Sequence, residues 1–116
     1  MRDLAETLEL HRKWLSGQGG QQAALAGVRL ALQDLPQADL SRSNMRGINL
    51  TGAFLKQANF SEADLSHASL KHASMEQANL SSAILNGANL VGVDLVGADL
   101  PLPRGSPGSE PFASLA

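Results

Sequence analysis

Large apolar residues recur at every fifth position along about two-thirds of the chain, and this period constrains the fold more than any other feature. A small residue comes two positions before each of them, and a mostly Asx or Ser position lies between. On a helix, at about 100° per residue, five steps place successive large residues roughly 140° apart, so no apolar stripe forms. On a flat strand an odd period puts alternate large residues on opposite faces. Only a chain that bends once per repeat can bury them all on one side.

The repeat assigns a role to each of its five positions. The large positions are Leu40, Met45, Leu50, Leu55, Phe60, Leu65, Leu70, Met75, Leu80, Leu85, Leu90, Leu95 and Leu100. The small residue and the large residue share one strand-like face, so both should point inward, and the following pair should form the corner. Gly recurs at the second corner position, where a positive φ is common. Other residues also stand there, which predicts that only some corners adopt a positive φ. They include Gln57, His67, His72 and Gln77.

The same phase extends toward the N-terminus. Leu25, Leu30 and Leu35 keep the count of five, so repeats are predicted over residues 23–102. The alternative is a helix over residues 21–35, because this segment is rich in Ala and Leu, which are good helix formers.

The tandem pattern A-(D/N)-L-x-x resembles that of the pentapeptide-repeat family. The resemblance implies an all-β solenoid, a right-handed quadrilateral β-helix with one repeat per side and four per coil. Residues 23–102 would then make about four coils. A weaker period of twenty agrees, since Gln37, Gln57 and Gln77 would stack in a ladder, as would Ser41, Ser61 and Ser81.

Residues 3–16 are predicted to form an amphipathic helix. Leu4, Leu8, His11 and Leu15 fall within one arc, with Trp14 at its edge. The L-x-x-H-x-x-W-L stretch, followed by Gly19-Gly20, resembles a lead-in found before pentapeptide repeats in some bacterial proteins. A β-helix ends in unpaired strand edges and an open apolar core, and terminal repeats must be capped to stay soluble. We therefore expect residues 1–22 to provide a capping helix and linker, with His11 hydrogen-bonded to an edge backbone group.

The last coil departs from the repeat by carrying apolar residues where polar ones are usual. They are Ile84, Val91, Val96 and Leu102. One interpretation is an end-to-end interface of a homodimer, as the family resemblance also implies. The alternative is that the tail covers this edge. Residues 103–116 are rich in Pro, Gly and Ser, so we expect a flexible tail, with docking of Phe112 and Leu115 as the alternative.

The sequence gives no sign of catalytic chemistry, a metal site or a cofactor. The chain has no Cys, which excludes disulfides and thiolate ligands. His67 and His72 would stand on adjacent sides and point in different directions, and no third ligand converges with them. The Asx column is expected to hydrogen-bond the corners. We therefore expect a non-enzymatic protein. It shows no apolar leader or membrane span, so it is expected to be cytoplasmic, although leaderless secretion would leave no mark.

The charge balance favours a structural or protein-interaction module with an unknown protein partner. The net charge is −2 and no block of like charge occurs, so no direct binding of nucleic acid is expected. The alternative is a DNA-mimicking modulator of DNA gyrase, as in the quinolone-resistance members of the family. Four coils spaced by about 4.8 Å span roughly 19 Å. Duplex DNA of that length carries about eleven negative charges, far more than this chain offers.

Overall fold

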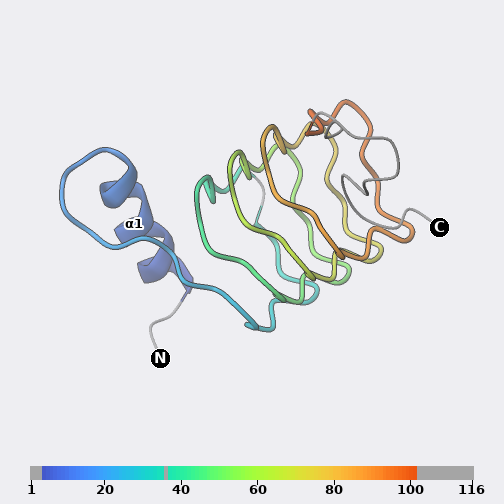
Figure 1. The fold of residues 1–116 in the computed structure, drawn as a ribbon, viewed down its shortest axis with the longest axis horizontal. Coiled ribbons are helices and arrows are strands. Elements are labelled where there is room, and N and C mark those ends of the chain that lie inside the picture. Colours follow the sequence, from blue (N-terminus) through green and yellow to red (C-terminus); the bar gives the residue numbers. More distant parts are fainter. Residues whose placement is uncertain (1–3, 36, 102–116) are drawn as a thin grey trace.

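The chain bends at every fifth residue and winds into a stack of coils (Figure 1). The computed structural model describes residues 4–35 and 37–101. Over these residues, isolated parallel bridges run from Ala24 with Asn44 to Asn79 with Asp99, always joining positions twenty apart. Four repeats therefore complete one coil, as the resemblance implied. The paired stretches are single-residue bridges, so no longer strand is defined within the described part of the chain.

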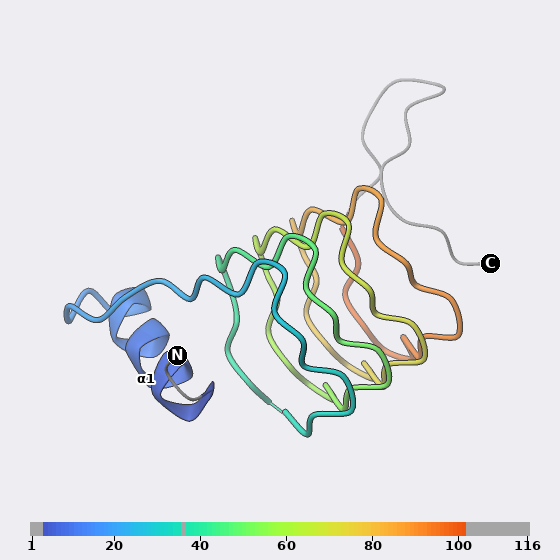
Figure 2. The same cartoon turned by 90° about the horizontal axis from the view of Figure 1, so that it is seen from below.

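The coils have four sides, which we number by the large inward residue of each. The first side is centred on Leu25, Met45, Leu65 and Leu85; the second on Leu30, Leu50, Leu70 and Leu90; the third on Leu35, Leu55, Met75 and Leu95; the fourth on Leu40, Phe60, Leu80 and Leu100. Figure 2 shows the coils in register, one behind the next. Every side chain therefore stacks on its equivalent in the neighbouring coil.

Backbone hydrogen bonds join consecutive coils on each side. On the first side, Met45 N–H donates to Asp64 O at 2.8 Å, and Asp64 N–H donates to Ser43 O at 3.0 Å. At the corner, Gly47 N–H donates to Ser66 O at 2.8 Å. The same pattern repeats along the stack, so the polar main-chain groups of the inner coils are paired despite their burial.

All of the corners share one backbone conformation, and here the sequence-based expectation was wrong. The second corner residue has a positive φ at every described corner from Gly27 to Gly97. Nine of these residues are not glycine, among them Gln57, His67 and His72. The first corner residue does not have a positive φ, and a hydrogen bond such as Ile48 N–H to Met45 O closes the turn at 3.1 Å. These are the features of a type II turn, and the ladder enforces it whatever side chain is present.

The core is a narrow column of alternating large and small side chains. Leu, Met and Phe at the centre of each side are fully buried in the inner coils, as are the Ala residues two positions earlier. Burial of each Leu contributes about 1.5–3 kcal/mol. Residues 23–35 form repeats of the first coil: Ala23, Leu25 and Leu35 are buried in this column, and Ala24 pairs with Asn44. The helix considered for this segment is therefore absent: Leu25 and Leu35 are buried as inward residues of the first coil, and Leu30 is partly buried.

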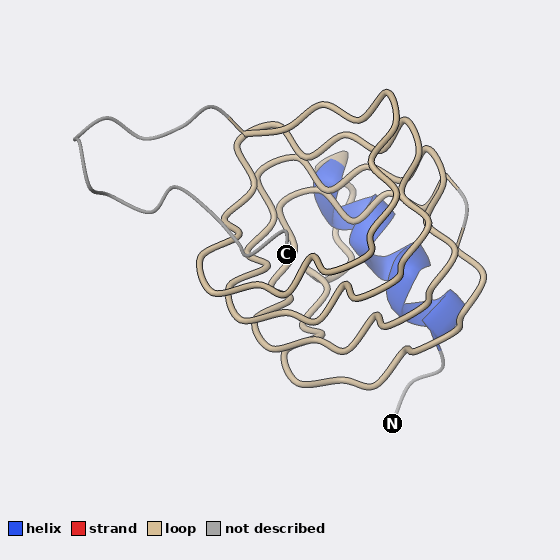
Figure 3. Cartoon of the chain, turned by 90° about the vertical axis from the view of Figure 1, so that its right-hand side faces the viewer, coloured by secondary structure: helices blue, strands red, loops and turns tan. Residues whose placement is uncertain are grey.

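Helix α1 (Leu4–Leu15) covers the N-terminal end of the stack. Figure 3, seen along the coils, shows α1 crossing the far end diagonally. Leu4 and Leu8 pack against the core of the first coil, so α1 is a capping helix. Among the described residues, no helix has the length and apolar character needed to cross a membrane. The predicted tail, with Phe112 and Leu115, lies outside the described residues.

Candidate functional surfaces

The Asx column makes the corner hydrogen bonds that its spacing predicts. Asn59 Oδ1 accepts from Ser61 N–H at 2.9 Å, and Asp94 Oδ1 accepts from Val96 N–H at 3.1 Å. Six further Asx residues bond the residue two positions later in the same way: Asp39, Asn44, Asn49, Asp64, Asn79 and Asn89. Each side chain thus satisfies the first N–H of its own corner, as in an Asx turn. These carboxylates and amides therefore serve to stabilise the corners.

Asp64 is also held by a charge from the neighbouring coil. Arg46 Nη1 lies 3.4 Å from Asp64 Oδ2 across the first side. Partial burial of the carboxyl group opposes its ionisation. The hydrogen bonds from Ser66 and the Arg46 guanidinium outweigh that effect and hold the pKa of Asp64 below its ordinary value.

The second corner positions form columns of outward side chains. Gln37 Nε2 donates to Gln57 Oε1 at 3.0 Å, and Gln57 Nε2 donates to Gln77 Oε1 at 3.1 Å, which confirms the glutamine ladder. His67 and His72 stand at two successive corners, and each ring leans over a glycine of the next coil. Its Nδ1 lies within 2.5 Å of where a Cβ of Gly87 or Gly92 would be. The two rings therefore belong to different columns, and no cluster of three metal-ligating side chains occurs in residues 4–35 and 37–101.

His11 joins α1 to both the beginning and the end of the first coil. The ring is fully buried; Ala23 N–H donates to its Nδ1 at 2.9 Å, and its Nε2 lies 2.6 Å from Ser41 O. Because a main-chain N–H can only donate and a carbonyl can only accept, Nδ1 must be the bare nitrogen and Nε2 must carry the proton. The neutral ring thus satisfies one donor and one acceptor at the open end of the solenoid.

Trp14 packs beside this contact and closes the rim of the first coil. Its ring stacks on His11 with centroids 5.6 Å apart, and the guanidinium carbon of Arg42 lies 4.8 Å from the Trp14 ring centroid. Leu15 is half-buried at the end of α1. The chain then turns back at Gly20, where a Cβ would lie 2.2 Å from Leu10 O. This close approach explains why a glycine stands at that turn.

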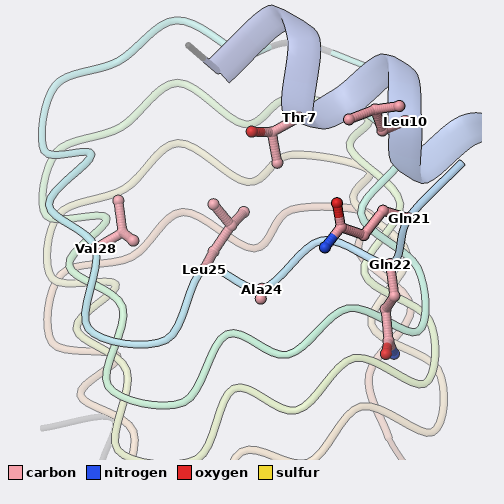
Figure 4. Close-up of a pocket in the computed structure, with 7 residues that line it drawn as sticks. All are labelled: Thr7, Leu10, Gln21, Gln22, Ala24, Leu25 and Val28. Atoms are coloured by element: carbon pink, nitrogen blue, oxygen red, sulfur yellow. The ribbon is translucent and has the colours of Figure 1, made fainter. Parts of the chain in front are cut away.

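A shallow hollow lies between α1 and the first coil (Figure 4). Its volume is about 190 Å³, and it is lined by Thr7, Leu10, Gln21, Gln22, Ala24, Leu25 and Val28. This is smaller than the roughly 300–1,000 Å³ of sites that enclose small organic ligands. Its walls carry amide and hydroxyl groups and no ionisable side chain, so it offers no acid, base or nucleophile.

The predicted interface residues of the last coil are spread over different sides. Ile84 lies at the middle of the first side, Val91 at the edge of the second and Val96 at the edge of the third. Ile84 and Val91 are half-buried, whereas Val96 is 73% exposed. Leu102 lies outside the described residues. A partner could touch all three described residues together only by approaching the end of the solenoid.

Two exposed apolar residues, Leu32 and Phe54, were not among the predicted site residues. Leu32 is 72% exposed at the corner between the second and third sides, and Phe54 is 51% exposed on the third side, one coil further on. The signal was available in the repeat, because Phe54 replaces an Asx and Leu32 occupies a corner filled elsewhere by polar residues or Gly.

The repeat and its fold match known sequences and structures. The family profile described as pentapeptide repeats matches residues 21–52, 38–77 and 63–100, with eight copies. No curated protein matches the chain.

The crystal structures that resemble the solenoid include those of three pentapeptide repeat proteins. HetL, a pentapeptide repeat protein involved in regulating heterocyst differentiation in the cyanobacterium Nostoc, is 46% identical over 70% of this chain, with a TM-score of 0.68. A second Nostoc pentapeptide repeat protein is 31% identical over 84% of the chain, with a TM-score of 0.64. One from the thylakoid lumen of Arabidopsis thaliana is 31% identical over 65%, with a TM-score of 0.55. The match spans 38% of HetL, 59% of the Arabidopsis protein and 86% of the second Nostoc protein.

Proposed function

Because the chain belongs to the pentapeptide-repeat family and shares its right-handed, four-sided β-helix, we propose that it is a non-catalytic protein-interaction module. The observation that carries this proposal is that the Asx side chains are occupied by hydrogen bonds within the fold. Its side chains bond their own corners, as Asn59 does with Ser61 and Asn89 with Val91. What the sides offer outward is a rigid, regularly spaced surface rather than a converging set of reactive groups.

The distribution of charge supports a protein partner over DNA mimicry. The second side carries Arg29 and Lys71 and no carboxylate, whereas the third side carries Lys56 with Asp34, Glu76 and Asp94. Adjacent sides thus differ in sign, with +2 on the second and −2 on the third. A duplex presents negative charge on every face, so this pattern does not favour the gyrase alternative.

A second copy of the chain is one partner that we propose. The C-terminal coil leaves Leu100 44% exposed and Val96 73% exposed, while α1 covers the opposite end. With one end capped, end-to-end contact would close at two copies instead of continuing into a fibre. The cytoplasmic location remains a prediction.

Affinity purification followed by reconstitution tests the proposed function. The tagged chain would be immobilised, exposed to lysate of its host, and washed; the retained protein would then be purified and titrated against the chain by calorimetry. We expect a stoichiometric complex. Retention of no protein above a tag-only control, or failure of the purified candidate to bind, would contradict the proposal.

A further inference from the structure

The C-terminal edge of the solenoid, onto which Figure 3 looks, presents main-chain groups that no described residue pairs. Inside the stack, consecutive coils exchange bonds such as Leu70 N–H to Asn89 O, at 2.9 Å. In the last coil, the groups that would bond a following coil have no hydrogen-bond partner among residues 4–35 and 37–101. On the second and third sides they are the N–H groups of Leu90, Gly92, Leu95 and Gly97 and the carbonyl groups of Ala88 and Val93. Such an edge is a template for pairing with another chain.

The side chains of the last coil do not block this edge. Exposed edges are commonly protected by Lys, Pro or a bulge, and residues 83–100 contain no Lys, Arg or Pro. A side chain at the second corner position leans toward the following coil, as the His67 ring does over Gly87. In the last coil such a side chain would project past the edge, but all three described residues at this position are Gly: Gly87, Gly92 and Gly97. Another main chain can therefore approach closely.

The four-sided shape of the edge selects the kind of chain that can pair with it. A straight strand could follow only one side, which offers about three residues between corners, and so short a pairing is marginal in water. A chain that itself bends every five residues could pair with several sides together and continue the ladder at about 4.8 Å per coil. The occupant that fits this edge is the end coil of another solenoid built from the same repeat.

The charge near this end selects among such solenoids. Residues 63–101 carry four carboxylates and a single base, Lys71, for a net charge of −3, whereas the described residues before them carry +1. Asp64 is paired with Arg46, but the last coil itself holds only Asp94 and Asp99, which are both exposed and have no base beside them in that coil. An identical end would add the same carboxylates to the contact. The edge therefore favours a coil that carries Lys or Arg.

The chain's own first coil does not meet this requirement. Stacked in register on the last coil of another copy, it would place Asp34 on Asp94 and Asp39 on Asp99, because these residues share two columns. Like charges placed directly opposite each other destabilise a pairing of strands. Helix α1 also covers that coil, with Leu4 and Leu8 packed on its core. Head-to-tail stacking of copies is therefore disfavoured.

We propose that the C-terminal edge stacks on the end coil of a second pentapeptide-repeat protein whose end is basic. This inference rests on the proposed function and names its surface and its class of partner. The unpaired main-chain groups supply the contact, and the carboxylates of Asp94 and Asp99 select the partner. A second copy of this chain has the required shape without the required charge, so it should bind this edge more weakly than a basic coil does.

A copy of the chain with a basic end serves as the probe. Asp94→Lys with Asp99→Lys reverses the charge of the last coil from −2 to +2 within the same repeat. Fluorescence anisotropy would follow labelled wild type titrated with this variant and, separately, with unlabelled wild type. We expect the variant to bind at least about tenfold more tightly, equivalent to about 1.4 kcal/mol. The difference should shrink as salt is added.

A matched control places the same charge at the opposite end. Asp34→Lys with Asp39→Lys makes the same change in the same two columns, three coils away. Each pair also removes one Asx turn, since Asp39 accepts from Ser41 N–H and Asp94 from Val96 N–H. We expect the control to bind labelled wild type no more tightly than wild type does. Circular dichroism would verify that each variant is folded.

A second basic end keeps the test valid if loss of the turn unfolds the first. Asn86→Lys with Val91→Lys places two Lys at corner positions of the last coil without removing an Asx turn. This pair should also bind labelled wild type more tightly than wild type binds itself.

Three results would overturn the inference: basic ends that bind no more tightly than wild type, an equal gain in the control, or no association at all, as when residues 102–116 cover this end. The partner retained in the affinity purification gives a separate readout. If that partner lacks the repeat, the proposed stacking is wrong while the interaction function stands. If no partner is retained, the proposed function itself fails.

Discussion

The main-chain N–H of Ala23 donates to Nδ1 of His11 at 2.9 Å, so the first residue of the first repeat is bonded directly to the capping helix. The same ring reaches Ser41 O, at the corner that ends the first coil. One side chain thereby links α1 to the exposed edge of the solenoid, where main-chain groups would otherwise lack partners.

Replacing His11 with Phe keeps most of the ring volume and removes both hydrogen bonds. We expect the free energy of unfolding to fall by about 1–3 kcal/mol for each buried main-chain group left without a partner. Urea denaturation would measure the loss. His11→Gln, which retains a donor and an acceptor, should recover part of it. A His11→Phe protein as stable as the wild type would show that the ring only fills space.

The uniform corner conformation predicts opposite effects of Gly at different positions. Glu62 is exposed with a φ of +59°, so Glu62→Gly should raise stability by about 1 kcal/mol, whereas Glu62→Ala should not. Gly47 has a φ of +66° and open space around it, so Gly47→Ala should lower stability by a similar amount for conformational reasons alone. Thermal unfolding would compare the three variants. Destabilisation by Glu62→Gly would contradict the conformational account.

Much of this fold could be predicted because one local rule acts at every repeat. The five-residue period dictated the bend, the inward Leu and Ala columns and the Asx turns, and the twenty-residue spacing of Gln37, Gln57 and Gln77 indicated four sides. The prediction for the corners was wrong because it considered only the backbone preference of each residue type. Once the ladder fixes the positions on either side, even a bulky residue such as Leu32 takes a positive φ.

The surface could be predicted only in part, because exposure depends on neighbours that the sequence does not place. Ile84 and Phe54 both interrupt the Asx column, yet Ile84 is half-buried and Phe54 is exposed. His11 was identified as a member of the helix arc, but its two partners come from residues 12 and 30 positions away. Only the winding of the coils brings those groups together.

The lowered pKa of Asp64 predicts that the protein loses stability in acid. Its pKa is lowered in the folded state, so its contribution is fully present above the unfolded value of about 3.9 and is lost as the pH falls through the lower folded value. Asp64→Asn keeps the turn-forming oxygen and removes the titration. The unfolding midpoint of the variant should therefore fall less than that of the wild type below about pH 4. Parallel acid profiles of the two proteins would contradict the role assigned to Arg46 and Ser66.

The proposed end-to-end dimer predicts a change of mass when charge is placed on the last coil. Light scattering should give the wild type twice the mass of one chain. Val91→Glu with Val96→Glu should give a monomer, because carboxylates would be forced into the contact. Thr51→Glu, in the same column as Val91 but two coils inward, should leave the dimer intact. An unchanged mass for the double variant would argue against this interface.

Cysteine pairing gives the most direct test of the central claim, that four repeats complete one coil and stack each residue on its counterpart twenty positions later. The chain has no Cys of its own, so engineered pairs are free of background. Ser69 and Asn89 are bridged neighbours, at a spacing of about 4.8 Å that a disulfide can span. Ser69→Cys with Asn89→Cys should therefore oxidise readily, whereas Ser74→Cys with Asn89→Cys, which lie on different sides, should not. Faster oxidation of the second pair would contradict the four-sided coil.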